Sequence, residues 1–407
     1  MFNNIDEALI WLYTRKNKNK DFSRIKYLIN KLDIYPNYKT ILISGTNGKG
    51  STALTIKEIL KNSNMHVGLF TSPFVVSFND RIMISDRFIS NAEIMHYLGI
   101  LYQENNQYLA LNNEEIPFFE LTFLMSLMFF KDRNIDLGIF ECGIGGKYDT
   151  VNILNPDVSI ITSIGYDHMN VLGNTLDEIL ANKLGIARPN KPLLINNNEK
   201  LLINNDIGFK LIDIHDSIKN IITNEKFTFF EFNNNTFKTA LLGEYQAYNT
   251  ALAISASYLI NPKINADLIN YSLEYIYIPG RLEKVSSKPL IYLDGAHNKS
   301  AIKELTNNIK LFKNKKKLVC VFYALKDKDY PSMLNILNNY VDEYYFTSID
   351  DSRATDYHLY LPYINKDYKY FDDCYNLLEK IKDDSNLYLF TGSLHFVSVI
   401  RNLLKWS

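Results

Sequence analysis

The chain has 407 residues, more than one ordinary hydrophobic core organises, so two domains are expected. Hydrophobic residues make up 46% and charged residues 22%, which is typical of a soluble globular protein. The formal net charge of -1 argues against nucleic acid or an anionic membrane as a partner, because both select strongly basic surfaces.

The cysteines and the N-terminal segment indicate a cytoplasmic protein. Cys142, Cys320 and Cys374 are scattered, form no CxxC pair and lack metal-ligand spacing, which favours a reducing compartment. Residues 1–20 lack the basic start, apolar core and small-residue cleavage site of a secretion signal. No coiled-coil repeat or obvious interface stripe argues against a monomer, which is the expected state, and other oligomeric states stay open.

Up to about residue 190, short β-branched runs alternate with helical patterns. The apolar stretch 118–130 contains Glu120 and is too short to cross a bilayer, so a buried helix is predicted. The alternation predicts an α/β fold with a mainly parallel sheet of P-loop type, and functional residues beyond the carboxyl ends of the strands. The predicted strands are 39–44, 66–70, 136–140 and 158–162, and the predicted helices are 52–62, 120–131 and 175–186.

The pattern restarts after Pro279-Gly280-Arg281, which predicts a boundary between two domains. Residues 1–280 are expected to form an ATP-binding domain, and residues 281–407 a smaller, Rossmann-like α/β domain. In the second domain the predicted strands are 290–293, 317–322, 343–347 and 387–390, and the predicted helices are 300–312, 332–340 and 394–404.

Residues 45–52, Gly-Thr-Asn-Gly-Lys-Gly-Ser-Thr, lie between a predicted strand and a predicted helix. Glycines let several backbone N–H groups point at one anion, and the helix N-terminus adds its dipole. Lys49 is expected to neutralise phosphates, and Ser51 to offer a hydroxyl to Mg²⁺. A merely structural turn is the alternative, but the lysine, the hydroxyls and the strand–helix context favour nucleotide binding.

Two further strand ends carry candidate metal ligands. Glu141 follows a predicted strand and precedes Gly143-Ile144-Gly145-Gly146, where the backbone is expected to approach a ligand closely. His168 follows the strand 158–162. A carboxylate and an imidazole could complete the coordination of a hard cation that phosphates and a hydroxyl already hold. Taken alone, His168 is more often an ordinary loop histidine. Lys183 lies on a mostly apolar helix, where composition does not distinguish a snorkelling side chain from a catalytic one.

Together these segments resemble the folylpolyglutamate synthase and dihydrofolate synthase family, relatives of the Mur ligases. The resemblance covers nearly the whole chain. It rests on Arg24-Ile25-Lys26, ISGTNGKGST (43–52), FTSPFVVSFNDRI (70–82), FECGIGGKYDTVNI (140–153), ITSIGYDHMNVLGNTLDEILANKLGIARP (161–189), LLGEYQAYN (241–249), PGRLE (279–283), LDGAHN (293–298) and TGSLHFV (391–397).

The resemblance implies that ATP phosphorylates the carboxylate of a folate or pteroate and that the amine of L-glutamate then attacks the acyl phosphate. Phosphorylation supplies the leaving group that a carboxylate lacks, and cations stabilise the developing charge. The activity would be that of a folylpolyglutamate synthase, with dihydrofolate synthase activity as a second possibility. The expected small molecules are ATP, Mg²⁺, L-glutamate and a folate or dihydropteroate.

The resemblance also implies roles for individual residues. The ATP phosphates would be held by Gly48, Lys49, Gly50 and Ser51, and further nucleotide contacts would come from Asn249, Arg281 and Asp294. For Arg281 a linker salt bridge is the alternative. Mg²⁺ would be bound by Ser72, Glu141 and His168, with Ser51 a further candidate. Lys183 would be carbamylated by CO₂ and position a second metal. The expected catalytic residues are Lys49, Lys183 and His297.

Four residues depart from the usual pattern of the family: Phe74, Pro117, Lys147 and Tyr245. They lie around the expected pterin site and leave the preferred acceptor open. The candidate substrate residues are Pro117, Phe118 and Tyr148, although aromatic core packing explains a phenylalanine there equally well.

Two alternatives stay open at this point. One is another Mur-type ligase that uses an amino-acid-bearing nucleotide, against which PGRLE and LDGAHN argue. The other is a P-loop ATPase without ligase activity, which would need neither Lys183 nor the residues of the second domain.

Overall fold

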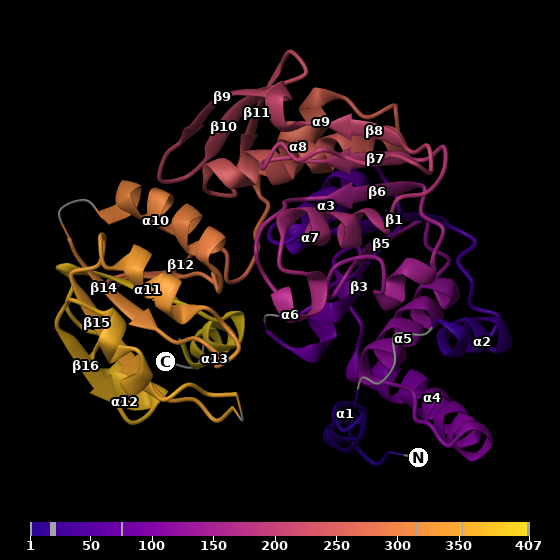
Figure 1. Cartoon of the computed structure of the whole chain (residues 1–407), viewed down its shortest axis with the longest axis horizontal. Coiled ribbons are helices and arrows are strands. Elements are labelled where there is room, and N and C mark those ends of the chain that lie inside the picture. Colours follow the sequence, from indigo (N-terminus) through magenta and orange to yellow (C-terminus); the bar gives the residue numbers. More distant parts are fainter. Residues whose placement is uncertain (1, 17–21, 75, 314–315, 352, 405–407) are drawn as a thin grey trace. The chain divides into compact units, whose positions relative to one another are not determined.

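The computed structural model describes residues 2–16, 22–74, 76–313, 316–351 and 353–404 (Figure 1). The chain divides into two compact units. The first comprises Met1–Ser217 with Tyr248–Ser272, and the second Ile218–Ala247 with Leu273–Ser407.

The first unit is built on an eight-stranded sheet with the strand order β4-β3-β2-β5-β1-β6-β7-β8. Neighbours from β2 to β8 pair in parallel, and β3 and β4 add an antiparallel edge. Every residue of β2, β5 and β6 is buried, as expected for strands covered on both faces. The strands are β1 (Lys39–Ser44), β2 (Val67–Phe70), β3 (Ile82–Ile84), β4 (Arg87–Phe88), β5 (Leu137–Glu141), β6 (Val158–Ile161), β7 (Pro192–Ile195) and β8 (Lys210–Asp213).

The helices of the first unit include the predicted buried one. Every residue from Glu120 to Phe130 is buried, and the Glu120 carboxylate accepts two hydrogen bonds from Arg24, over 2.8 and 2.7 Å. The helices are α1 (Ile5–Tyr13), α2 (Ser23–Lys31), α3 (Lys49–Asn62), α4 (Asn91–Asn112), α5 (Phe118–Asp132), α6 (Met169–Leu172) and α7 (Leu176–Leu184), with most of α8 (Glu244–Ile260) and α9 (Ala266–Glu274). None of the helices in the described ranges is long and apolar enough to cross a membrane.

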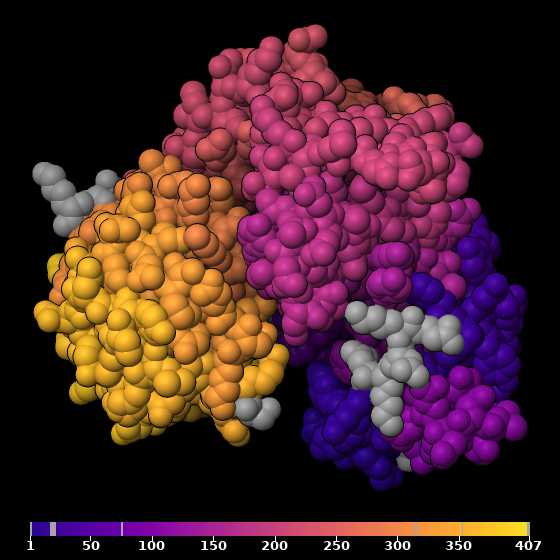
Figure 2. All heavy atoms as spheres, in the orientation of Figure 1, coloured from indigo at the N-terminus to yellow at the C-terminus, as the bar shows by residue number. Residues whose placement is uncertain are grey.

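The second unit contains two sheets. The larger has the order β12-β13-β17-β14-β15-β16 and is parallel except for β12, and the smaller is the antiparallel sheet β11-β10-β9. The C-terminal segment of this second unit, coloured orange to yellow in Figure 2, forms one compact body. The strands are β9 (Ile218–Thr223), β10 (Thr228–Phe232), β11 (Asn235–Thr239), β12 (Glu283–Ser287), β13 (Leu290–Leu293), β14 (Lys317–Phe322), β15 (Glu343–Thr347), β16 (Tyr368–Phe371) and β17 (Asn386–Thr391), and the helices are α10 (Lys299–Lys313), α11 (Tyr330–Leu337), α12 (Cys374–Lys380) and α13 (Leu394–Leu404).

The predicted α/β class is confirmed, and β1, β13, β14, β15 and α13 have the predicted bounds. Other predicted elements differ by a few residues at their ends. The helix after the phosphate loop begins at Lys49 rather than at residue 52, because Gly48 adopts a left-handed conformation and becomes its N-cap. Helix α4 and the small antiparallel sheet were not predicted.

Candidate active site

The phosphate loop connects β1 to α3 and requires glycine at two positions. Gly45 has a φ of 152° and Gly48 a φ of 87°. A Cβ on Gly48 would lie 2.2 Å from Oδ1 of Asn249, and one on Gly45 would lie 1.9 Å from Oγ1 of Thr162. Both distances are impossible for real atoms, so the loop depends on glycine for space as well as for conformation. The predicted nucleotide-binding residues Gly48 and Asn249 therefore lie side by side.

The segment after β6 holds this loop in place. Oγ1 of Thr162 donates to the Asn47 carbonyl over 2.6 Å, and the Asn47 N–H donates to Oγ of Ser163 over 3.0 Å. No side chain caps α3, because its N-cap is Gly48. A fixed loop that leads into an uncapped helix N-terminus is a site for anions such as phosphates. Nζ of Lys49 donates to the carbonyls of residues 45 and 46, which keeps the cation over the loop.

The predicted metal ligands Ser72 and Glu141 are neighbours. Glu141 is the last residue of β5 and only 5% exposed, and its Oε2 accepts the N–H of Ser72 over 3.2 Å. A Cβ on Gly50 would lie 3.6 Å from the same oxygen, so the carboxylate faces the first turn of α3. Ser51 follows in that turn and is buried. The phosphate loop, a carboxylate and a hydroxyl thus share one edge of the sheet.

Lys183, on α7, is almost completely buried, with 1% of its surface exposed, so the snorkelling alternative is wrong. Burial and, less strongly, the charge of Lys49 lower the pKa of Lys183 to about 7, against the opposing charges of Cys142 and Asp167. The side chain of Lys183 forms no hydrogen bond or ion pair with the described residues. A substantial fraction of this amine is therefore neutral, and hence nucleophilic, at neutral pH.

Two of the glycines after Glu141 allow helix α7 to pack closely against this loop. A Cβ on Gly145 would lie 2.3 Å from Oδ1 of Asn182, and one on Gly146 would lie 2.9 Å from the Lys183 carbonyl. The Gly146 N–H also donates to Oδ1 of Asn182 over 3.0 Å. These two glycines therefore bring the loop against the helix that carries Lys183, and the approach of this run to a ligand stays a prediction.

His168 adopts a left-handed conformation with φ of 50° as the N-cap of α6. Its Nε2 lies 3.9 Å from Oδ1 of Asp167, the residue whose charge also acts on Lys183. In the described ranges no group of three or more His, Cys, Asp and Glu side chains is arranged to hold a metal ion. A cation at Ser72 and Glu141 would therefore depend on hydroxyls and on ligand oxygens, a donor set that suits a hard cation.

Three predicted residues of the second unit also form a cluster. Asp294 follows β13, is 4% exposed, and accepts the N–H groups of Leu282 and Ala296 over 2.8 and 2.9 Å. Burial raises the pKa of Asp294, while the charges of Arg281 and His297 oppose that rise. Arg281 and His297 thus lie close enough to Asp294 to act on it electrostatically.

The predicted substrate residues differ in their surroundings. Pro117 is buried at the N-cap of α5, and the ring of Phe118 stacks on that of Tyr13 with centroids 5.5 Å apart. Tyr148 is 49% exposed, and Nζ of Lys147 lies 5.3 Å from its ring centroid. The sequence predicted no role for Arg81, but its side chain contacts both this region and a predicted metal ligand. Its Cζ lies 5.4 Å from the ring centroid of Phe118. Its Nη1 also donates to Oγ of Ser72 over 3.2 Å.

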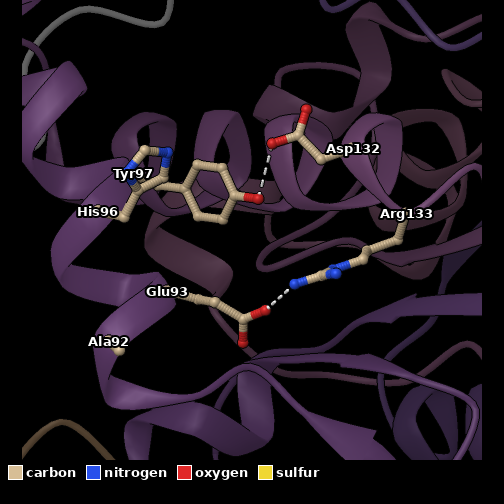
Figure 3. A pocket seen from close by; sticks show the side chains of 6 residues that line it. All are labelled: Ala92, Glu93, His96, Tyr97, Asp132 and Arg133. Atoms are coloured by element: carbon tan, nitrogen blue, oxygen red, sulfur yellow. Dashed lines mark hydrogen bonds and ion pairs between the residues drawn. The ribbon is translucent and has the colours of Figure 1, made fainter.

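A hollow of about 400 Å³ elsewhere in the first unit is not part of this site (Figure 3). It lies between the start of α4 and the end of α5, near the amino end of β5, whereas Glu141 ends that strand. Its charged groups already have partners: Tyr97 donates to Asp132 over 2.9 Å, and Arg133 pairs with Glu93 over 2.5 Å. Nothing in this hollow requires a ligand.

Comparisons with known proteins agree along the whole chain. The Mur ligase middle domain model matches residues 43–257, and the Mur ligase glutamate ligase domain model matches residues 280–394. A dihydrofolate synthase/folylpolyglutamate synthase of Bacillus subtilis (strain 168) is 32% identical over 434 residues, which cover 100% of both chains. A folylpolyglutamate synthase of Lacticaseibacillus casei is 30% identical over 81% of each chain. A crystal structure of a bifunctional folylpolyglutamate synthase/dihydrofolate synthase with Mn, AMPPNP and L-glutamate bound is similar with a TM-score of 0.84 at 25% identity, covering 99% of this chain and 98% of that one.

Proposed function

We propose a function on the premise that this chain belongs to the Mur ligase family, in its branch of dihydrofolate synthases and folylpolyglutamate synthases. The chain is an ATP-dependent ligase that joins L-glutamate to a folate, and it also accepts dihydropteroate. The observation that carries the proposal is the common edge of the sheet where the phosphate loop, Ser72 and Glu141 meet.

The reaction has two chemical steps. A carboxylate oxygen of the acceptor attacks the γ-phosphorus of ATP, the bond to the bridging oxygen breaks, and ADP leaves with that electron pair. The glutamate amine then attacks the acyl carbon, phosphate leaves from the tetrahedral intermediate, and the nitrogen loses a proton. The first step needs cations around the transferring phosphoryl group, and under this proposal Lys49 and the N-terminus of α3 would supply this electrostatic stabilisation.

Nucleotide-binding residues are assigned in each unit separately under this proposal. In the first unit these residues are Gly48, Lys49, Gly50, Ser51 and Asn249. In the second unit, Arg281 and Asp294 bind the nucleotide and His297 acts in catalysis, which is supported by the cluster that the three side chains form.

A divalent cation, Mg²⁺ in this proposal, would be held by Ser72, Glu141 and His168, with Ser51 as a further donor. The similar structure with Mn and AMPPNP bound supports the binding of a divalent cation as well as a nucleotide. The cation would neutralise charge on the phosphates. Lys183 would react with CO₂ through its neutral amine and become an anionic carbamate, a role that its burial and its pKa of about 7 support.

The remaining assignments are also proposals. Residues 1–280 would form the ATP-binding domain and residues 281–407 the glutamate-ligase domain. Pro117, Phe118 and Tyr148 would contact the acceptor. The protein would act as a cytoplasmic monomer on small molecules, without nucleic acid or membrane partners.

Parallel ligation assays test this function. Purified protein is incubated with ATP, Mg²⁺ and radiolabelled L-glutamate, together with either dihydropteroate or tetrahydrofolate, and the products are identified by mass spectrometry. We expect glutamylated product from both acceptors. Lys49→Ala should abolish product formation, whereas Lys200→Ala, at a side chain 71% exposed, should not. ATP hydrolysis without amide would indicate an ATPase, and product only from an amino-acid-bearing nucleotide would indicate another Mur-type ligase.

A further inference from the structure

Arg81 differs from the other buried arginines in the described part of the chain. Arg24, Arg81 and Arg401 are 3%, 7% and 8% exposed. Arg24 makes two hydrogen bonds to the Glu120 carboxylate, over 2.8 and 2.7 Å, and Nε of Arg401 lies 2.9 and 3.2 Å from the two oxygens of Glu283. Arg81 forms no ion pair with any described residue. Its charge is thus buried without the carboxylate that neutralises the other two.

Aromatic rings and one hydroxyl surround the Arg81 guanidinium. Its Cζ lies 5.2 Å from the ring centroid of Phe74, 5.4 Å from that of Phe118 and 5.9 Å from that of Phe78. Nη1 donates to Oγ of Ser72, but the buried Nε–H has no hydrogen-bond partner, and no described residue accepts a bond from Nη2. A planar group with five N–H donors therefore has most of its donors unused.

Burying a guanidinium in this way costs free energy unless an anion pairs with it and accepts its hydrogen bonds. Ring faces attract the cation but cannot accept the in-plane N–H groups, which fit the two oxygens of a carboxylate or phosphate. Glu141 acts on Arg81 electrostatically without forming an ion pair with it. Because Ser72 contacts both Arg81 and Glu141, the unused donors lie beside the proposed metal ligands.

We propose that Arg81 is a substrate-binding residue that receives the carboxylate of the acceptor, the group that becomes phosphorylated. This inference rests on the proposed function and adds a residue to it. Dihydropteroate, one of the two proposed acceptors, carries its reactive carboxylate directly on an aromatic ring, and the partly exposed rings of Phe74 and Phe118 offer faces for such a ring. Neither glutamate nor the triphosphate of ATP has a ring beside its anionic group, so the acceptor fits these surroundings best.

The test compares dihydropteroate with its carboxamide, which has the same ring system but no negative charge. Equilibrium binding of both compounds, and of ATP, is measured by calorimetry on the full chain. The variants are Arg81→Gln, Arg81→Lys and the matched surface control Arg87→Gln, whose guanidinium is 54% exposed and pairs with Glu93. Thermal unfolding of each variant shows which of them are folded.

We expect the unmodified chain to bind the acid at least about tenfold more tightly than the amide, since hydrogen bonds to charged groups are among the strong ones. In Arg81→Gln this ratio should fall to within about twofold of one. Arg81→Lys should give an intermediate ratio, because lysine keeps the charge without the planar fork. ATP affinity should stay unchanged in both variants, and Arg87→Gln should behave like the unmodified chain.

Two results would overturn the inference while the proposed function stands. One is an acid-to-amide ratio that persists in Arg81→Gln or, if that variant does not fold, an unchanged ratio in Arg81→Lys. The other is a loss of ATP affinity with an unchanged ratio, which would make the nucleotide phosphates the anion at Arg81. An unmodified chain that binds no dihydropteroate would overturn both the inference and the proposed function.

Discussion

The backbone N–H of Ser72 donates a hydrogen bond to Oε2 of Glu141 over 3.2 Å. Strands β2 and β5 are parallel neighbours in the sheet, with Phe70 opposite Phe140, so both chains leave the sheet at the same edge. This single contact places the hydroxyl-bearing residue after β2 next to the carboxylate that ends β5. It also fixes the orientation of the carboxylate before any cation binds.

Replacing Glu141 by glutamine should lower kcat/KM for ligation by at least about 100-fold. Glutamine keeps the size of the side chain and can still accept the Ser72 N–H, but it removes the negative charge that a cation needs. The loss should be larger at low than at high Mg²⁺. The matched control is Glu115→Gln in the same unit, at a carboxylate that is 44% exposed, and it should retain activity. Comparable activity of both variants across a Mg²⁺ titration would contradict the assignment of Glu141 as a ligand of the cation.

A methyl group at Gly48 should abolish tight nucleotide binding. The residue has a φ of 87°, and its Cβ would lie 2.2 Å from Oδ1 of Asn249, so Gly48→Ala must distort the loop. We expect ATP affinity, measured by calorimetry, to fall by at least about tenfold. Gly99→Ala is the control, because nothing lies within 4 Å of the added Cβ in helix α4. It should be neutral or raise the free energy of unfolding by about 0.5–1 kcal/mol. ATP binding unchanged in Gly48→Ala would show that the loop does not hold the phosphates.

Lys183 should form a carbamate with dissolved CO₂ at neutral pH. With a pKa of about 7 the amine is half neutral at pH 7, whereas a lysine at the ordinary value of 10.5 is neutral in about one molecule in 3,000. At constant dissolved ¹³CO₂, a protein carbamate signal in the ¹³C NMR spectrum should be strong above pH 7. It should fall steeply below pH 7, because protonation removes the nucleophilic lone pair.

The control for this signal is Lys57, a second buried lysine in the described part of the first unit, which pairs with Glu58. Lys57→Met should keep the carbamate signal, and Lys183→Met should remove it together with ligation activity. A signal that survives in Lys183→Met belongs to another amine. Full activity of Lys183→Met without added CO₂ would show that ligation needs no carbamate.

The ion pair between Arg24 and Glu120 should contribute to the free energy of unfolding and not to catalysis. Arg24→Met leaves the Glu120 carboxylate, whose side chain is 8% exposed, without its bidentate partner. We expect the free energy of unfolding in urea to fall by about 3–5 kcal/mol. The exposed control Arg87→Gln should stay within about 0.5 kcal/mol. Activity per folded molecule of Arg24→Met should be unchanged, and a selective loss of kcat would place this pair in the active site.

Much of the fold follows from local sequence patterns. The strands β13, β14 and β15 are short apolar runs that follow Pro289, Lys316 and Asp342, so their starts could be predicted from the chain alone. Helix α4 was not predicted because few of its residues are buried and apolar residues such as Leu109 and Leu111 also lie at exposed positions, which obscures the helical period. The small antiparallel sheet starts with β9, whose exposed positions give no regular alternation.

The candidate site, too, could be predicted only in part from the sequence. The phosphate loop and Glu141 lie in continuous motifs whose residue types and spacing predict phosphate and metal binding. For Lys183 the expected role follows only from the resemblance to the family. A role for Arg81 could not be predicted from the sequence, because it depends on tertiary contacts such as the one with Phe118 on another element. That Arg81 is buried without an ion pair is known only from the structure. The close packing of Gly145 and Gly146 against α7 is likewise a tertiary feature, although both glycines are evident in the sequence.

Transfer of ¹⁸O from the acceptor to phosphate tests the central claim, amide formation through an acyl phosphate, most directly. Dihydropteroate labelled in both carboxylate oxygens is incubated with the protein, ATP, Mg²⁺ and L-glutamate, and the inorganic phosphate is analysed by mass spectrometry. One labelled oxygen should appear in phosphate for each amide formed, because the attacking carboxylate oxygen leaves with the phosphoryl group. Amide formation with unlabelled phosphate would contradict this account.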